Sequence, residues 1–160
     1  IIENSQNLNI NISIKKKNYD YLVNSESLKN TLTEIKDLFK ENYRDQNIIH
    51  MIVNNYLING KRYFFFEDNI KSDDLCLEVN FISISKNLEQ IFDKIFEKYQ
   101  IKVEQFFDLN YLENQLKDEK LELPEIVQKI RNGYNVNEIT LIPKNIKNKG
   151  FFENFFQLFS

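Results

Sequence analysis

Several residue types that carry chemistry in other proteins are scarce in this chain. Its 160 residues include one cysteine, one histidine and three widely separated glycines. A single cysteine excludes an internal disulfide and any site with several cysteine ligands, and it is typical of a reducing compartment. With Gly60, Gly133 and Gly150 so far apart, neither a phosphate-binding loop nor a dinucleotide fingerprint can be drawn. We therefore expect no enzymatic activity, no cofactor and no metal site.

The chain also lacks a charge excess and long apolar runs. Its formal net charge is −3, which gives no general reason to expect a nucleic-acid partner. No apolar run approaches the ~20 residues that a membrane-spanning helix needs. With 42% hydrophobic and 28% charged residues, its composition is that of an ordinary globular protein. We expect one domain with its own core, with room for a small appendage.

Apolar residues follow strand periodicity in some segments and helix periodicity in others. Alternation predicts strands over 8–14, 48–58 and 75–84, and spacings of three and four predict helices over 28–39 and 88–99. This order predicts an α+β fold, with a mostly antiparallel sheet, two main packed helices and a short C-terminal amphipathic helix.

Turn and capping residues refine this prediction. Asn59-Gly60 predicts a hairpin, because both residues tolerate positive φ, and "KRYFFFED" follows as a returning strand or an extended edge. Ser25 or Ser27 is expected to cap the first helix, and Ser85 the second. The segment "IKVEQFF" at 101–107 predicts a further strand.

After Asp108 the pattern weakens. A short helix is expected at "LNYLENQL", and a second one has Pro124 at its start and Gly133 just past its end. "NEITLIP" predicts a last short strand. We expect three parts, which are an α+β subdomain (1–108), a helical and short-strand extension packed on it (109–143), and a basic linker with an amphipathic tail (144–160).

The polar residues inside these elements favour structural roles. His50 lies in an apolar strand without a second histidine, so we expect a partly buried structural residue. Cys76 also lies in a strand and is expected to be a small core residue rather than a nucleophile. The pairs Glu67-Asp68 and Asp73-Asp74 flank an expected loop, where adjacent carboxylates fix no separation suited to acid–base catalysis. A solvated surface is the better interpretation.

An aromatic run follows the predicted hairpin turn. The run is "RYFFF", and with Lys61 and Arg62 it could be a base-stacking platform for nucleic acid. However, consecutive phenylalanines on a strand point to opposite faces, and the chain is acidic overall. A buried core or a protein contact is therefore favoured. The predicted partner-contact residues are Arg62, Tyr63, Phe64, Phe65 and Phe66.

The last ten residues contain five of the fourteen phenylalanines. On a helix their apolar side chains share one broad arc, and nearby lysines would each gain about 1 kcal/mol from anionic headgroups. One such tail is expected to bind a membrane surface weakly and reversibly. The alternative is that it covers an apolar face of the same domain or a neighbour's, and the residues favour neither. The predicted membrane-binding residues are Lys144, Lys147, Lys149, Phe151, Phe152, Phe155, Phe156, Leu158 and Phe159.

Two segments resemble part of the bacterial cell-division protein FtsA, an actin-like protein. They are "NIIHMIVNNYLINGK" and "LEVNFISISKNLEQIFDKIFEKYQIKVEQFF". In that family this arrangement belongs to a strand-helix-strand-strand subdomain inserted into the actin-like core. The subdomain mediates subunit contacts along polymers and contacts with later division proteins. The family ends in a linker and an amphipathic membrane-targeting helix, which "KNKGFFENFFQLFS" is similar to.

The departures from the family limit what the resemblance implies. The actin-type nucleotide loops are absent, and the subdomain that contacts FtsZ has no counterpart, so neither ATP binding nor FtsZ binding is implied. What is implied is a reduced or truncated, non-enzymatic division adaptor at the septum. It would be cytoplasmic and peripheral at the inner face of the cell membrane. Its partners would be division proteins or further copies of itself, and the membrane surface, with no nucleic acid. The alternative is a soluble interaction domain whose aromatic tail docks on its own or a neighbouring core.

Overall fold

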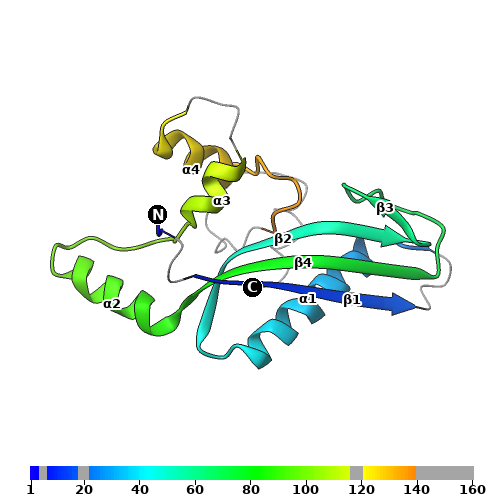
Figure 1. Ribbon diagram of the computed structural model, residues 1–160, viewed down its shortest axis with the longest axis horizontal. Coiled ribbons are helices and arrows are strands. Elements are labelled where there is room, and N and C mark those ends of the chain that lie inside the picture. Colours follow the sequence, from blue (N-terminus) through cyan, green and yellow to red (C-terminus); the bar gives the residue numbers. More distant parts are fainter. Residues whose placement is uncertain (4–6, 18–21, 116–120, 140–160) are drawn as a thin grey trace.

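The computed structural model describes residues 1–3, 7–17, 22–115 and 121–139. These residues form a four-stranded sheet with helices on both faces and at one end (Figure 1). The elements are β1 (Asn7–Lys17), α1 (Ser25–Asn42), β2 (Gln46–Ile58), β3 (Lys61–Tyr63), β4 (Asp74–Ser85), α2 (Lys86–Glu97), α3 (Leu109–Gln115) and α4 (Leu123–Arg131). The predicted α+β class is confirmed, while the predicted C-terminal helix lies outside the described residues.

The strands follow the order β1-β4-β2-β3, and every neighbouring pair is antiparallel. The hairpin between β2 and β3 turns at Asn59 and Gly60, whose φ values of 54° and 69° are those that a tight hairpin turn requires. This confirms the predicted turn. The returning strand is shorter than its sequence suggested, because only Lys61–Tyr63 pairs with β2.

Strand β2 carries two bulges, where Ile49 and Asn54 are extra residues relative to β4. Each bulge shifts the alternation of side chains by one position. The shift keeps the apolar residues on both sides of Asn54 on one face of the sheet, in a single core cluster. On β2 these residues are Met51, Val53, Tyr56 and Ile58.

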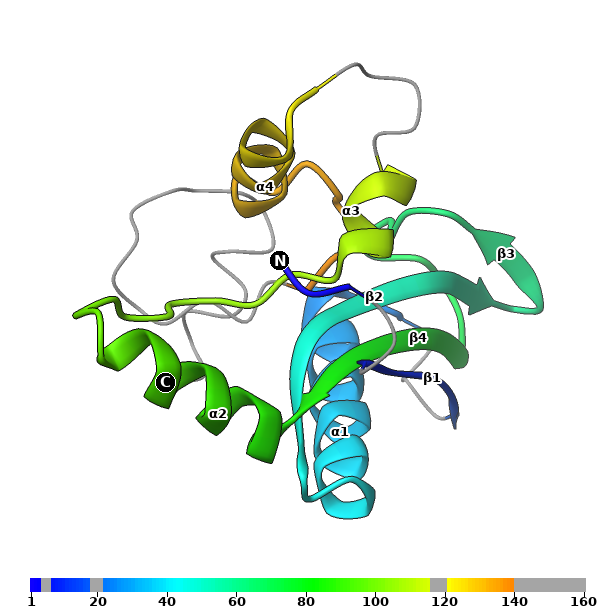
Figure 2. The same cartoon turned by 60° about the vertical axis from the view of Figure 1, so that its left-hand side comes forward.

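Helix α1 covers that face of the sheet (Figure 2). It buries Leu28, Thr31, Leu32, Ile35 and Phe39. The ring of Phe39 stacks on Phe81 of β4 with centroids 4.7 Å apart.

Helix α1 begins at an asparagine cap and not at the predicted serines. The Asn24 side chain accepts the backbone N–H of Ser27, and the Ser27 hydroxyl accepts the N–H of Asn24. Ser27 is the third residue of the helix. Its hydroxyl bonds the backbone N–H of the cap residue Asn24, which completes a reciprocal capping box.

The other face of the sheet carries α3 and α4, which lie above it in Figure 1. Pro124 stands in the first turn of α4, and Gly133 follows its end with φ 78°, as predicted. A second apolar cluster joins both helices to the sheet. Its buried members are Ile52, Ile82, Phe107, Tyr111, Leu112, Ile126 and Ile130. The end of β4 is therefore buried on both sides.

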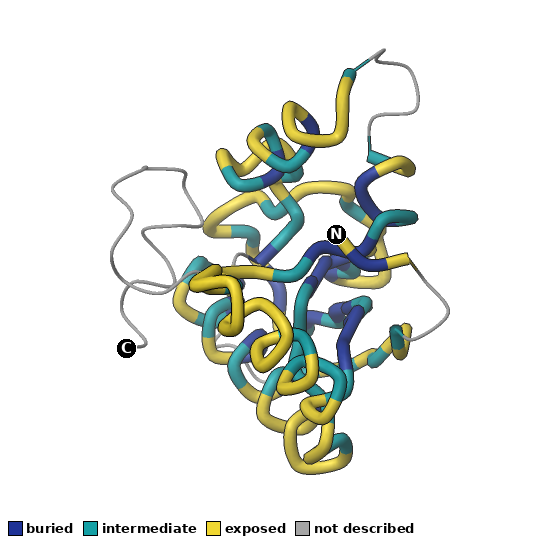
Figure 3. Tube along the Cα trace, turned by 90° about the vertical axis from the view of Figure 1, so that its left-hand side faces the viewer, coloured by how far each residue is buried: buried dark blue, intermediate teal, exposed yellow. Residues whose placement is uncertain are grey.

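Helix α2 follows β4 without a loop and projects from the end of the sheet (Figure 1). The predicted cap is confirmed, since the Ser85 hydroxyl accepts the N–H of Leu88 at 3.2 Å. Both α1 and α2 were expected to pack on the sheet, but of these two helices α1 alone has a buried face. Helix α2 has no fully buried residue, and it comes to the front in Figure 3 coloured exposed or intermediate.

The predicted strand over 101–107 is wrong. Among the described residues this segment pairs with no strand, and the bridge just after it joins Asp108 to Ile2. Strand β4, which α2 follows, is already paired on both sides with β1 and β2, so the segment cannot pair beside it. Of the predicted strand "NEITLIP", Glu138 bridges to Ile52, and residues 140–143 lie outside the described residues.

Candidate partner-contact surfaces

The predicted partner-contact residues lie at the edge of the sheet. Arg62 and Tyr63 belong to β3, which is the last strand in the sheet order. Phe64 is 68% exposed and Phe65 is 62% exposed. Phe66 turns inward and packs near Tyr56, with ring centroids 5.9 Å apart. We call these five residues the aromatic edge.

The loop that carries the aromatic edge is fastened at its base. Val23 and Ile70 exchange two backbone hydrogen bonds of 2.8 and 3.0 Å. The Asp68 carboxylate accepts the N–H of Ser25 at 2.7 Å, and the amide of Asn137 donates to the carbonyl of Phe64 at 2.9 Å. The backbone is thus fixed on both sides of two rings that project into solvent.

This arrangement can accept an extended partner segment. In the described part of the chain, no strand pairs with the outer side of β3, so its backbone groups there are open to pairing. Adding a strand at a free sheet edge is a common mode of peptide recognition, in which side-chain contacts supply specificity. Exposed aromatic side chains next to such an edge are typical anchors of protein interfaces.

A second apolar surface lies on α2 and the segment that follows it. Ile91, Ile95 and Phe96 lie within one broad side of the helix, and Tyr99 and Ile101 follow its end. The exposed members are Ile91, Ile95, Phe96, Tyr99 and Ile101. We call these five residues the α2 apolar face. Sequence reasoning identified the stripe but assigned it to the core.

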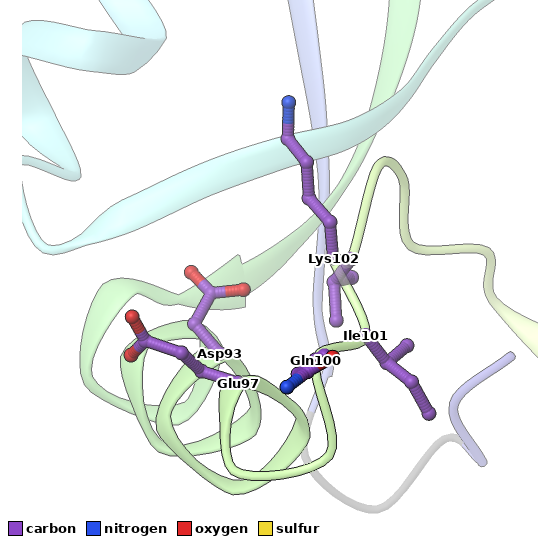
Figure 4. Close-up of a pocket in the computed structure, with 6 residues that line it drawn as sticks. Asp93, Glu97, Gln100, Ile101 and Lys102 are labelled. Carbon is purple, nitrogen blue, oxygen red and sulfur yellow. The ribbon is translucent and has the colours of Figure 1, made fainter.

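Beside this face is a groove between α2 and residues 101–103. It has a volume of about 440 Å³, and its wall combines two carboxylates with apolar side chains. Figure 4 shows Asp93 and Glu97 side by side on the helix, with the Lys102 side chain extending away from them. Neither carboxylate forms an ion pair with a residue in the described ranges. The lining residues are Asp93, Glu97, Gln100, Ile101, Lys102 and Val103, and we call this the α2 groove.

His50 lies at the centre of a polar network on the α3 side of the sheet. It is 1% exposed, which is more complete burial than expected. Its Nε2 accepts the backbone N–H of Asp108 at 3.1 Å, so its Nδ1 carries the proton and donates to Glu138 at 2.7 Å. The Tyr111 hydroxyl also donates to Glu138 and accepts the amide of Asn135. The network therefore fixes α3 and residues 135–138 against β2.

The polar groups of this network satisfy one another. Burial, and then the charge of Glu138, raise the pKa of Tyr111 far above its ordinary value. Both nitrogens of His50 are engaged by protein groups. A histidine in an apolar strand requires polar partners. The sequence could have signalled that need, but it could not identify Tyr111 and Glu138.

The remaining predicted polar residues are at the surface or half-buried. Cys76 lies in β4 as expected but is half-buried and outside the core, because it points to the opposite face from its buried neighbours. Burial raises the pKa of its thiol, which disfavours the reactive thiolate. Glu67 and Asp73 are exposed. Asp74 instead accepts the N–H of Asn59 and pairs with Lys15 at 3.0 Å.

The predicted membrane-binding lysines and tail residues lie outside the described residues. Within the described ranges, no helix is long and apolar enough to cross a membrane. No group of three or more His, Cys, Asp or Glu side chains suited to a metal ion occurs there either. No protein-family model matches the chain, and no curated protein does so.

Proposed function

We propose that this protein is a non-enzymatic, FtsA-like cell-division adaptor. The aromatic edge contacts a protein partner, and the amphipathic segment 151–159 attaches the chain to the inner membrane surface. The observation that carries the proposal is the exposure of Phe64 and Phe65, at 68% and 62%, beside an unpaired strand edge. Large exposed aromatic side chains grouped on a fixed loop mark interaction sites.

The element order agrees in part with the resemblance on which the division role rests. Strand β2, the Asn59-Gly60 turn, strand β4 and helix α2 follow one another as the two resembling segments suggest, but the strand expected at 101–107 does not form. The family's inserted subdomain serves in protein contacts. An interaction role therefore agrees with the position of the aromatic edge.

The membrane half of the proposal is supported by the sequence of the tail. Fully burying one phenylalanine gains roughly 1.5–3 kcal/mol, but immersion in an interface recovers only part of this, and ordering a short helix opposes it. A single tail thus binds weakly. Several copies brought together by a partner or by self-association bind firmly, because the later tails attach at a high effective concentration.

Vesicle sedimentation tests the membrane half. We expect the full chain to sediment with vesicles that contain anionic lipid, and a chain ending at Lys149 to stay in the supernatant. Neutral vesicles serve as the control, since they remove the contribution of Lys144, Lys147 and Lys149. Equal supernatant fractions for the two chains on anionic vesicles would contradict membrane attachment.

Self-association on those vesicles tests the aromatic edge. We expect chemical crosslinking of the vesicle-bound protein to give oligomers, and the double variant Phe64→Ser/Phe65→Ser to give markedly fewer. Leu38→Ser is the matched control, because Leu38 is an exposed apolar residue on α1. Oligomers in equal amounts from the wild type and the double variant would exclude the edge as the contact.

A further inference from the structure

We infer that the aromatic tail, residues 151–159, packs on the α2 apolar face of its own chain when no membrane competes for it. The inference deepens the proposed function, since it concerns the same tail and rests on its having two alternative partners. It identifies the α2 apolar face and the α2 groove as an internal docking site.

The first argument is that α2 requires an apolar partner. Helix α2 has 12 residues, a length at which an isolated helix is marginal in water. Most helical stability in proteins comes from packing of the apolar face. Yet none of its residues is fully buried, and Ile91, Ile95 and Phe96 are exposed. Among the described aromatic residues, the ring of Phe92 lies near Phe96 and Phe106.

The second argument is reach. Ile139, the last described residue, donates its N–H to the carbonyl of Met51 in β2 at 2.7 Å. Met51 is five residues along β2 from Gln46, which pairs with Ser85, the cap of α2. That path is ~17 Å at the rise of a β-strand, and α2 adds ~18 Å from Ser85 to Glu97, so a path along both elements is ~35 Å. Eleven residues, 140–150, separate Ile139 from Phe151 and can extend up to ~36 Å.

The third argument is the advantage of a tethered partner. A segment joined to its binding site by a short flexible connection is present at an effective concentration near the millimolar range. A second copy of the chain is far more dilute at ordinary protein concentrations. The tail of the same chain is therefore the favoured occupant over a tail from another copy.

The fourth argument is complementarity. The tail has a lysine-rich segment immediately before its aromatic residues, with Lys147 and Lys149 two residues apart. The α2 groove has acidic side chains on its helix side, where Asp93 and Glu97 lie side by side (Figure 4), and its other side is lined by Ile101, Lys102 and Val103. Lysines near the two carboxylates would place the first phenylalanines against the apolar wall. The following rings would then lie along Ile95 and Ile91.

A docked tail gives the membrane a competitor within the chain. Only one of the two apolar surfaces can hold the rings at a time, so binding at the membrane requires release from α2. A ligand shifts such an equilibrium only by its difference in affinity for the two states. This competition weakens the attachment of a single chain to the membrane. Clustered chains still attach firmly, because their later tails bind at a high effective concentration.

Tryptophan fluorescence without vesicles tests the contact. The chain contains no tryptophan, so Phe155→Trp in the full chain is its sole indole. We expect acrylamide to quench this indole several-fold less than in the same chain with Ile91→Asp/Ile95→Asp. Leu38→Asp is the matched control, because Leu38 is 43% exposed against 44% and 45% for the two isoleucines. Equal quenching in all three proteins would overturn the inference.

Disulfide trapping tests whether the occupant belongs to the same chain. In a Cys76→Ser background, Ile95→Cys with Phe155→Cys should oxidise to a crosslinked monomer several-fold faster than Leu38→Cys with Phe155→Cys. Equal rates, or disulfide-linked dimers as the main product, would overturn docking within one chain.

Indole quenching and vesicle sedimentation together separate this inference from the proposed function. Strong quenching with normal sedimentation on anionic vesicles would overturn the docking site and leave the membrane tether. Protection of the indole without sedimentation would establish docking and overturn the tether.

Discussion

Helices α1 and α2 start from similar sequence patterns and end in different environments. Both are amphipathic, and both begin at a side-chain cap, provided by Asn24 and Ser85. Helix α1 buries five residues against the sheet, whereas α2 buries none. An amphipathic pattern therefore establishes that one side of a helix is apolar. It does not establish that the surrounding fold covers that side.

The reason for the difference is the topology of the sheet. Helix α1 lies over a face supplied by alternating residues of β2 and β4. Helices α3 and α4, through the second apolar cluster, occupy the other face. Helix α2 follows the end of β4 without a loop. At that point α1 covers one face of the sheet, and α3 and α4 cover the other. Its apolar side depends on a partner beyond the sheet.

The largest effect should come from a matched pair of isoleucines on the two helices. Ile35→Ala in α1 is expected to lower the free energy of unfolding by about 2–5 kcal/mol, because Ile35 is fully buried. In a chain ending at Lys149, which lacks the tail proposed to cover α2, Ile95→Ala should cost less than about 1 kcal/mol, because Ile95 is 45% exposed. Urea denaturation monitored by circular dichroism measures both. Equal losses would mean that α2 is as deeply covered as α1.

The next effect concerns α3, which is short but anchored by the buried polar network around His50. Glu138→Ala leaves the Nδ1–H of His50 and the Tyr111 hydroxyl without their acceptor. Leaving buried donors unsatisfied costs about 1–3 kcal/mol, measured by thermal or urea unfolding. Glu113→Ala, an exposed position on α3, is the control and should change little. Matching losses from the two variants would show that the network does not hold α3.

Removing the cap of α1 should lower global stability, whereas removing the cap of α2 should affect local stability alone. Asn24→Ala is expected to lower global stability by about 1 kcal/mol, because α1 unfolds with the core. Ser85→Ala should instead accelerate amide hydrogen exchange about five-fold within α2 and leave the unfolding midpoint nearly unchanged. A clear drop in the midpoint for Ser85→Ala would show that α2 and the sheet unfold together.

The smallest effect is expected at the end of β4 opposite α2. A hydrogen bond from Lys15, and then one from the N–H of Asn59, lower the pKa of Asp74. A carboxyl group with a lowered folded pKa contributes stability above its unfolded pKa and loses it as the pH falls through the folded value. Stability should thus decline below about pH 4 through this group. Unfolding measured across that range should decline less in Asp74→Asn, and identical profiles would contradict the assignment.

Much of the fold could be predicted because it depends on local signals. Alternating apolar residues located the strands, and Asn59-Gly60 fixed the hairpin through backbone freedom. The bulge at Asn54 also had a signal, since the spacing between Val53 and Tyr56 breaks the alternation of an ordinary strand. Such features depend on residues near one another in the sequence.

The errors arose where distant partners decide the outcome. "IKVEQFF" has a strand pattern, but β4, the strand that precedes α2, is already paired on both sides, so the segment finds no place beside it. Cys76 shares the strand of Leu75 and Leu77 but points to the other face. The network around His50 joins residues 58 and 88 positions apart, and no local pattern encodes that separation. The exposure of Phe64 and Phe65 likewise depended on the length of β3.

The attachment of Ile139 has a mechanical consequence. This residue is 1% exposed in the core beneath α1, and residues 137–139 are hydrogen-bonded to Met51 and Val53 in the middle of β2. Traction on the C-terminal end of the chain would therefore be carried into the centre of the sheet, where β4 supports β2 along its length. A tether joined there resists detachment better than one joined to a fraying strand end.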